Sequence, residues 1–178
     1  MLTSAELRQL GDPLAFLQSD HLREREICTL LDRIAAAPVV DQQDRRDVLI
    51  FLREVLPFHL ADEEHDLFSV LRERCEPEDQ IEKVFDRLLA EHGHAANCAP
   101  EVTAILERYQ PGDGALSGPE RAVLSRYATQ ARRHLVLENA IVIPFARLRL
   151  SEKDRDELRL RMLERRGLNR LWEGANDD

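Results

Sequence analysis

Four histidines and two glutamates recur along the chain in an order and at a spacing that could bind metal. They are His21, His59, Glu63, His92, His134 and Glu138. Two pairs have the spacing His-x-x-x-Glu, which on an α-helix puts both side chains on one face. Imidazole and carboxylate ligands together suit iron, manganese or zinc better than calcium or magnesium. The sequence therefore predicts a transition-metal site, and six ligands suit two ions better than one.

Helix start and stop signals indicate the elements that would position these residues. Asp12-Pro13 and Ser117-Gly118-Pro119 are typical helix starts, and prolines and glycines separate the segments. Pro57 and Pro100 lie inside helices and should loosen them, because proline lacks the backbone donor. We expect four long helices and a short fifth one, over residues 13–37, 41–75, 77–110, 117–148 and 151–167.

Within each long helix the residues three and four positions apart form one stripe, typical of the inward face of a bundle. The stripes are Leu14, Leu17, His21, Glu24, Cys28, Leu31 and Ala35; Leu49, Leu52, Leu56, His59, Glu63, Asp66 and Val70; Ile81, Phe85, Leu88, His92, Ala95, Ala99, Val102 and Leu106; and Leu124, Tyr127, Ala131, His134, Glu138, Ile141, Phe145 and Leu148. Each stripe is apolar at its ends and polar in the middle. Counted from the turns at about 1.5 Å per residue, the polar breaks lie within about one helical turn of a common level. This predicts an all-α, up-down-up-down four-helix bundle with the six residues in one layer.

Burial of these groups without a partner would be unfavourable, at several kcal/mol for each carboxylate. A bound metal is the simplest explanation for the whole set. Glu24 lies one turn after His21 on the same stripe, and is a candidate extra ligand or proton donor, although an inward glutamate can also reach solvent at a helix seam. We expect ordinary surface or packing roles for the remaining notable residues, which are Cys28, Glu64, His65, Asp66, His94 and Tyr127. Glu64 could instead support a ligand from outside the metal centre. Arg165 and Arg166 should be solvated or close a surface ion pair.

Composition and charge exclude several classes of protein. The net charge of -9 argues against nucleic acid as a partner. No stretch approaches the roughly 18 apolar residues of a membrane span. The first residues lack the pattern of a signal peptide, and the three cysteines form no C-x-x-C motif. We therefore expect a cytoplasmic protein with one domain over residues 1–167 and a flexible tail over 168–178.

The order of the six residues resembles that of the hemerythrin-like cation-binding (HHE) family. The flanking segments HLADEEHDLF, AEH and HLVLENAIVIPFA are similar too, and the later segment ERRG resembles the family's C-terminal helix. The resemblance covers about residues 14–167. It implies a hemerythrin-like bundle with two non-haem iron ions, bridged by oxo or hydroxo groups and carboxylates. Such a centre would react with dioxygen, peroxide or nitric oxide. Glu63 and Glu138 would be the bridges, and the histidines would be terminal ligands.

The chain also departs from the oxygen-carrying hemerythrins. Those have a second histidine one turn along the third helix and an aspartate as the last carboxylate, where this chain has Ala96 and Glu138. Water, another carboxylate or an open position would replace the imidazole. Sensing, redox defence, small-molecule reduction and iron handling stay open, with or without catalytic turnover, in a monomer or a homodimer with an unidentified redox partner.

A second hypothesis is a non-enzymatic metal module, either an iron sensor or a bundle braced by zinc or manganese. Ferritin-like oxidation is disfavoured, because its signature is Glu-x-x-His and the pairs here have the opposite order.

Overall fold

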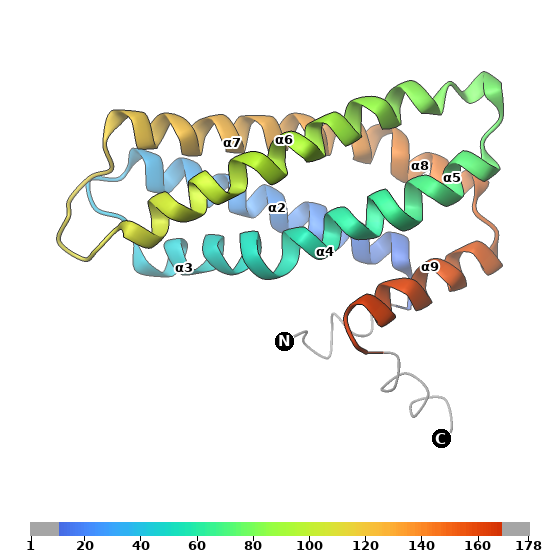
Figure 1. Cartoon of the computed structure of the whole chain (residues 1–178), viewed down its shortest axis with the longest axis horizontal. Coiled ribbons are helices and arrows are strands. Elements are labelled where there is room, and N and C mark those ends of the chain that lie inside the picture. Colours follow the sequence, from blue (N-terminus) through green and yellow to red (C-terminus); the bar gives the residue numbers. More distant parts are fainter. Residues whose placement is uncertain (1–10, 169–178) are drawn as a thin grey trace.

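The computed structural model describes residues 11–168, in which four long helices run antiparallel and a fifth crosses one end (Figure 1). The first long helix is α2 (Pro13–Ala36), and the third is α6 (Ile81–Arg108). The second consists of α3 (Gln42–Ile50), α4 (Leu56–Ala61) and α5 (Phe68–Arg74), and the fourth of α7 (Gly118–Leu137) and α8 (Ile143–Arg149). The fifth is α9 (Glu152–Arg165). The predicted all-α bundle with an additional C-terminal helix is confirmed. Apart from Leu168, the predicted tail lies outside the described residues.

Side-chain caps explain where the helices begin. The carboxylate of Asp12 accepts hydrogen bonds from the backbone N–H groups of Leu14 and Ala15, at 3.0 and 3.2 Å. Ser117 at the start of α7 forms a capping box with the glutamate three residues later. The third helix begins later than predicted, because Pro77–Asp79 (η3) is a 3-10 turn and Gln80 adopts a left-handed conformation with φ of 51°.

Three short π-helical segments interrupt the second and fourth helices. They are η1 (Phe51–Val55), η2 (Asp62–Leu67) and η4 (Glu138–Val142). The first directly precedes Leu56-Pro57, where a loosened helix was predicted, whereas α6 stays helical through Pro100. Glu63 lies in η2 and Glu138 in η4, so both glutamates of the predicted metal site occupy π-helical turns. Such turns are often found at functional sites.

The π segments shift which residues face the core. In α2 and α6 the predicted stripes are buried, apart from the half-buried Ala95. Beyond η4, however, Val142 and Ala146 are fully buried instead of Ile141 and Phe145, and Leu148 is 74% exposed. The same one-residue shift on either side of η1 and η2 buries Val48, Leu67 and Leu71 rather than Leu49 and Val70. A π turn contains an extra residue, which rotates everything beyond it.

The core is divided into two apolar clusters by the layer of buried histidines and glutamates. The first cluster includes Leu31, Val102 and Leu124, and the second includes Leu17, Phe85 and Met162. The polar side chains lie between the two clusters at mid-height, as the depth argument predicted. None of the helices formed by residues 11–168 combines the length and apolar character that crossing a bilayer requires.

Helix α9 packs against α2 and the π segment η2, and an ion pair fixes its start. The guanidinium of Arg74 donates to both carboxylate oxygens of Asp154 at 2.8 and 3.0 Å. Asp154 also accepts a hydrogen bond from the backbone N–H of Ser151 at 3.0 Å, which completes a capping box. The bonds from Arg74 outweigh burial and hold the pKa of Asp154 well below its usual value. This carboxylate therefore joins the end of α5 to the start of α9.

The Asp154→Asn variant is expected to lower the free energy of unfolding by about 1–2 kcal/mol at pH 7. Because the pKa is lowered in the folded protein, the carboxylate stabilises the fold above pH about 4 and loses this effect as the pH falls. The difference between variant and wild type should therefore stay constant from pH 7 to about pH 5 and shrink below about pH 4 in urea unfolding curves. Asp156→Asn, on the exposed face of α9, is the control. A difference that stays constant down to about pH 3 would contradict the assignment.

Candidate metal centre

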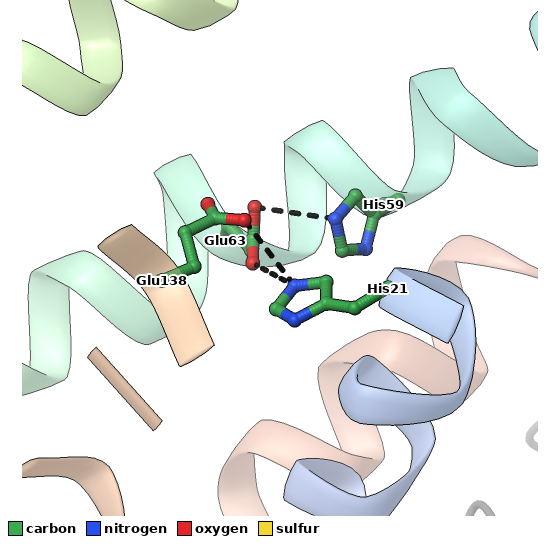
Figure 2. A group of neighbouring side chains, drawn as sticks. All are labelled: His21, His59, Glu63 and Glu138. Carbon is green, nitrogen blue, oxygen red and sulfur yellow. Dashed lines mark hydrogen bonds and ion pairs between the residues drawn. The ribbon is translucent and has the colours of Figure 1, made fainter. Parts of the chain in front are cut away.

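The six predicted residues converge in the middle of the bundle, and all are at least nine-tenths buried. On one side, Nε2 of His21 lies 3.1 Å from Oε1 of Glu63 and 3.3 Å from Oε2 of Glu138. Nε2 of His59 lies 3.4 Å from Oε2 of Glu63 (Figure 2). The first, second and fourth helices thus supply one group of four donors.

A second group lies on the other side of the same two carboxylates. Nε2 of His134 is 2.9 Å from Oε1 of Glu138, and Nε2 of His92 is 3.4 Å from the same oxygen. His92 is also 3.5 Å from Oε2 of Glu63. Within each group, one donor atom per residue lies within 4.8 Å of all the others. The two groups are His21, His59, Glu63 and Glu138, and Glu63, His92, His134 and Glu138.

The hydrogen bonding of the layer is incomplete in the way that a metal centre requires. Both nitrogens of His59 and one oxygen of each glutamate are buried without a hydrogen-bond partner. Nε2 of His92 faces Nε2 of His134 at 2.9 Å, so the two lone pairs need a proton or a cation between them. Buried polar atoms are rarely left unpaired. The donor set therefore fits cations held between the histidines and glutamates.

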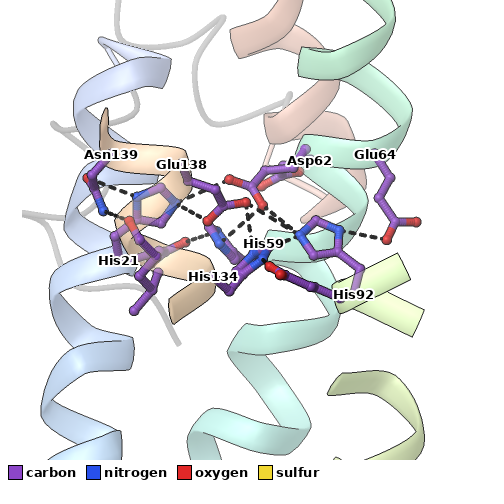
Figure 3. A network of polar contacts seen from close by, with 12 residues as sticks. His21, His59, Asp62, Glu64, His92, His134, Glu138 and Asn139 are labelled. Atoms are coloured by element: carbon purple, nitrogen blue, oxygen red, sulfur yellow. Dashed lines mark hydrogen bonds and ion pairs between the residues drawn. The ribbon is translucent and has the colours of Figure 1, made fainter. Parts of the chain in front are cut away.

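Three of the histidines are oriented by partners on their outer nitrogen (Figure 3). Nδ1 of His21 lies 3.2 Å from Oδ1 of Asn139, whose own Nδ2 donates to the carbonyl of Leu135 at 2.7 Å. Nδ1 of His92 lies 2.8 Å from Glu64, and Nδ1 of His134 lies 3.2 Å from Glu91. Such partners leave Nε2 available for a metal. His59 differs, because its Nδ1 lies 3.9 Å from Oδ2 of Asp20, which is beyond hydrogen-bond distance. Sequence reasoning allowed a supporting role for Glu64 but did not identify Asn139 or Glu91, since they lie off the inward stripes.

The buried glutamates affect the protonation of the histidines in the layer, and a bound metal ion would compete with those protons. Burial disfavours a charged His21, but the hydrogen bond and charge of Glu63 outweigh it and raise the pKa of His21 to about 9. Burial likewise acts against charge on His134, and Glu138 raises its pKa to about 9. Burial lowers the pKa of His59 to about 3, so this imidazole is neutral. Without metal, protons on the histidines therefore balance the two glutamates, and a bound metal would displace them.

The Asn139→Ala variant is expected to weaken metal binding about 10–100-fold without abolishing it, because the His21 ring loses the partner that orients it. Chelator competition measures the affinity. Asn97→Ala, at an exposed position of α6, is the matched control. Unchanged affinity in Asn139→Ala would mean that packing alone orients His21.

An ion-pair cluster beside Glu63 was not predicted. Asp62 is fully buried, and its Oδ2 accepts a hydrogen bond from Nη2 of Arg166 at 2.6 Å. Asp66 accepts one from Nη2 of Arg165, also at 2.6 Å. The expectation that the two arginines are solvated or pair at the surface is therefore wrong for Arg166, whose side chain is only 8% exposed. The cluster ties the turn that carries Glu63 to the end of α9.

Of the other residues considered in the sequence, Glu24 lies near the candidate metal centre, and the rest have ordinary surface or core positions. Glu24 is 4% exposed and lies near the layer, but belongs to neither group of four donors; burial raises its pKa to about 7. His65 and His94 are exposed, and Cys28 and Tyr127 are buried, as expected.

A comparison with known protein families finds a match. The model of the family described as Hemerythrin HHE cation binding domain matches residues 12–146, which include all six converging residues. No curated protein sequence matches the chain significantly.

Proposed function

This chain belongs to the hemerythrin HHE cation-binding family, and we propose that its buried layer holds two non-haem iron ions that react with a small oxidant: dioxygen, peroxide or nitric oxide. One observation carries the proposal. The two groups of four donors share Glu63 and Glu138, which is the arrangement expected when two ions are bridged by two carboxylates. Sensing, redox defence and iron handling are the processes that such a centre would serve.

The histidines and glutamates of the layer would bind the metal, and the apolar residues around them would keep water out. His21 and His59 would be terminal ligands of one ion, His92 and His134 of the other, with both glutamates bridging. When bound, iron supplies coordination positions and electrons for the oxidant. The apolar clusters above and below limit water; the ring of Phe68, for example, stacks on His92 with centroids 5.8 Å apart.

Glu24 is proposed as a proton donor near the His92 and His134 half of the centre. Its carboxyl is buried, and it lines the same cavity as these two histidines. A protonated carboxyl next to a site where an oxidant gains electrons can supply the proton that the reduced oxygen needs.

Metal analysis combined with rapid mixing tests the proposal. About two irons per chain are expected, and they should be lost in the His59→Ala/His134→Ala double variant. Anaerobic stopped-flow mixing of the reduced protein with oxygen or peroxide should produce a visible charge-transfer band within seconds. One zinc or manganese per chain, or an unreactive iron protein, would count against it.

A metal module without chemistry is the alternative. It is favoured by the fact that all four long helices supply a donor, so bound ions could simply brace the bundle. A spectral response to azide or nitric oxide separates the two functions, because a brace with closed coordination would give none.

A further inference from the structure

A cavity of about 300 Å³ lies beside the second half of the proposed centre. Residues from all four long helices line it, and it is on the side of the polar layer that faces the first apolar cluster. His92 and His134 form part of its wall, whereas the other four proposed ligands do not. Two larger hollows, one lined by Phe16 and Phe51 and the other by Arg33 and Asp44, are not lined by any of the proposed ligands. The cavity therefore gives access to one half of the centre.

Two of the polar side chains that line the cavity, besides the histidines, are buried. The hydroxyl of Tyr127 has no hydrogen-bond partner, although the residue is only 3% exposed. Glu24 lies on the same wall and is 4% exposed. A buried hydroxyl is normally satisfied. An oxygen-containing group of a bound molecule would supply the missing partner.

The cavity also has an apolar lining, which includes Leu56, Leu60, Ala95 and Ala131. The exposed Arg87 and Arg133 border it too. Ala95 is half-buried and its methyl group lines the cavity. Small side chains here leave room that a larger residue would fill.

The size of the cavity exceeds what a diatomic molecule needs. A single water molecule requires only about 10–15 Å³ of such space. Pockets for small organic molecules begin at about 300 Å³. The volume, the apolar lining and the unpaired hydroxyl of Tyr127 together match a compact organic molecule with an oxygen head group.

We propose that this cavity binds a small organic hydroperoxide, with its apolar body against Leu56, Leu60 and Ala131 and its head group at Tyr127 and Glu24. The proposal rests on the proposed function and names its substrate class. Reduction breaks the O–O bond, consumes the two electrons that a pair of ferrous ions releases on becoming ferric, and takes up two protons. The products are one alcohol and one water molecule.

Binding is tested with an unreactive probe, cumyl alcohol, by calorimetry on the full chain with its metals bound and oxidised. The wild type is expected to bind the probe, and Ala95→Phe should lose binding about tenfold or more, because the ring fills the cavity. Asn97→Phe is the matched control, since Asn97 is exposed and outside the cavity. Tyr127→Phe keeps the shape and should weaken binding through loss of the hydroxyl. No binding to the wild type, or equal binding to Ala95→Phe, would overturn the proposal.

Reactivity gives the second measurement. The reduced protein is mixed with cumene hydroperoxide or with hydrogen peroxide, and the rate of iron oxidation is compared. Ala95→Phe should slow the reaction with cumene hydroperoxide about tenfold or more while changing that with hydrogen peroxide little, because only the larger molecule fills the cavity. Equal effects on both peroxides would overturn the inference. Two irons that react with hydrogen peroxide in a protein that binds no cumyl alcohol would leave the proposed function intact.

Discussion

The Glu63→Gln variant is expected to lose both metal ions rather than one. Its carboxylate belongs to both groups of donors, and Glu63 is fully buried, so no solvent or nearby exposed residue can take its place. Metal content should fall from about two ions per chain to nearly none, because the bridging charge that holds the two cations together is removed. Elemental analysis of protein purified from iron-replete cells measures the effect, and Glu138→Gln should behave in the same way.

Two further variants make this result specific. His65→Ala lies on the same π-helical turn but is exposed, and should retain both ions. His59→Ala removes a donor from one group only, so the second group could retain its ion. A Glu63→Gln protein with one ion per chain at full occupancy would show that this glutamate binds a single metal.

The second large effect is that the His59→Leu substitution should destabilise the metal-bound protein but not the metal-free protein. In the metal-bound protein the variant should be much less stable, because a ligand is lost. A metal held at about a thousand times its dissociation constant stabilises the folded state by about 4 kcal/mol. For a domain of this size, the loss corresponds to a fall in Tm of about 10 °C.

In the metal-free protein the same substitution should be neutral or stabilising. Both nitrogens of His59 are buried without a partner, and leucine removes these unpaired atoms from the core. Thermal unfolding by circular dichroism, before and after treatment with a chelator, tests the reversal. His65→Leu, an exposed substitution nearby, serves as the control. A metal-free His59→Leu protein that melts well below the metal-free wild type would mean that His59 stabilises the core by itself.

The sequence was sufficient to predict the bundle and the level of the polar layer because both follow from local signals. Caps and prolines determined the helix ends, and a regular spacing predicted the buried face of the uninterrupted helices. In α2, for instance, Leu17, His21, Cys28 and Leu31 are all buried as predicted.

The same reasoning failed beyond the π turns. A constant helical period carried past Glu138 selects Ile141 and Phe145, whereas the structure buries Val142 and Ala146. A π turn depends on tertiary contacts, and no single residue type predicts it reliably. The outer partners Asn139 and Glu91 were also missed, because their roles depend on which histidine lies opposite in space.

The ion pairs of α9 were missed for a related reason. Asp62 and Arg166 are 104 positions apart in the sequence. Nothing in the spacing of charged residues distinguishes this buried pair from the many exposed ones, such as that between Lys153 and Glu157. Long-range pairing of charges needs the geometry of the fold.

The π turns also affect how this chain should be compared with other sequences. Each turn accommodates one more residue than a regular α-helix over the same length. A relative that lacks the turn at Glu138–Val142 would align without error on one side of it and be displaced by one position on the other. The correct alignment then requires a single-residue gap inside a continuous helix, where gaps are normally penalised. Placed at the exposed Ala140, such a gap would keep His134 and Glu138 in register on one side and Val142 and Ala146 on the other.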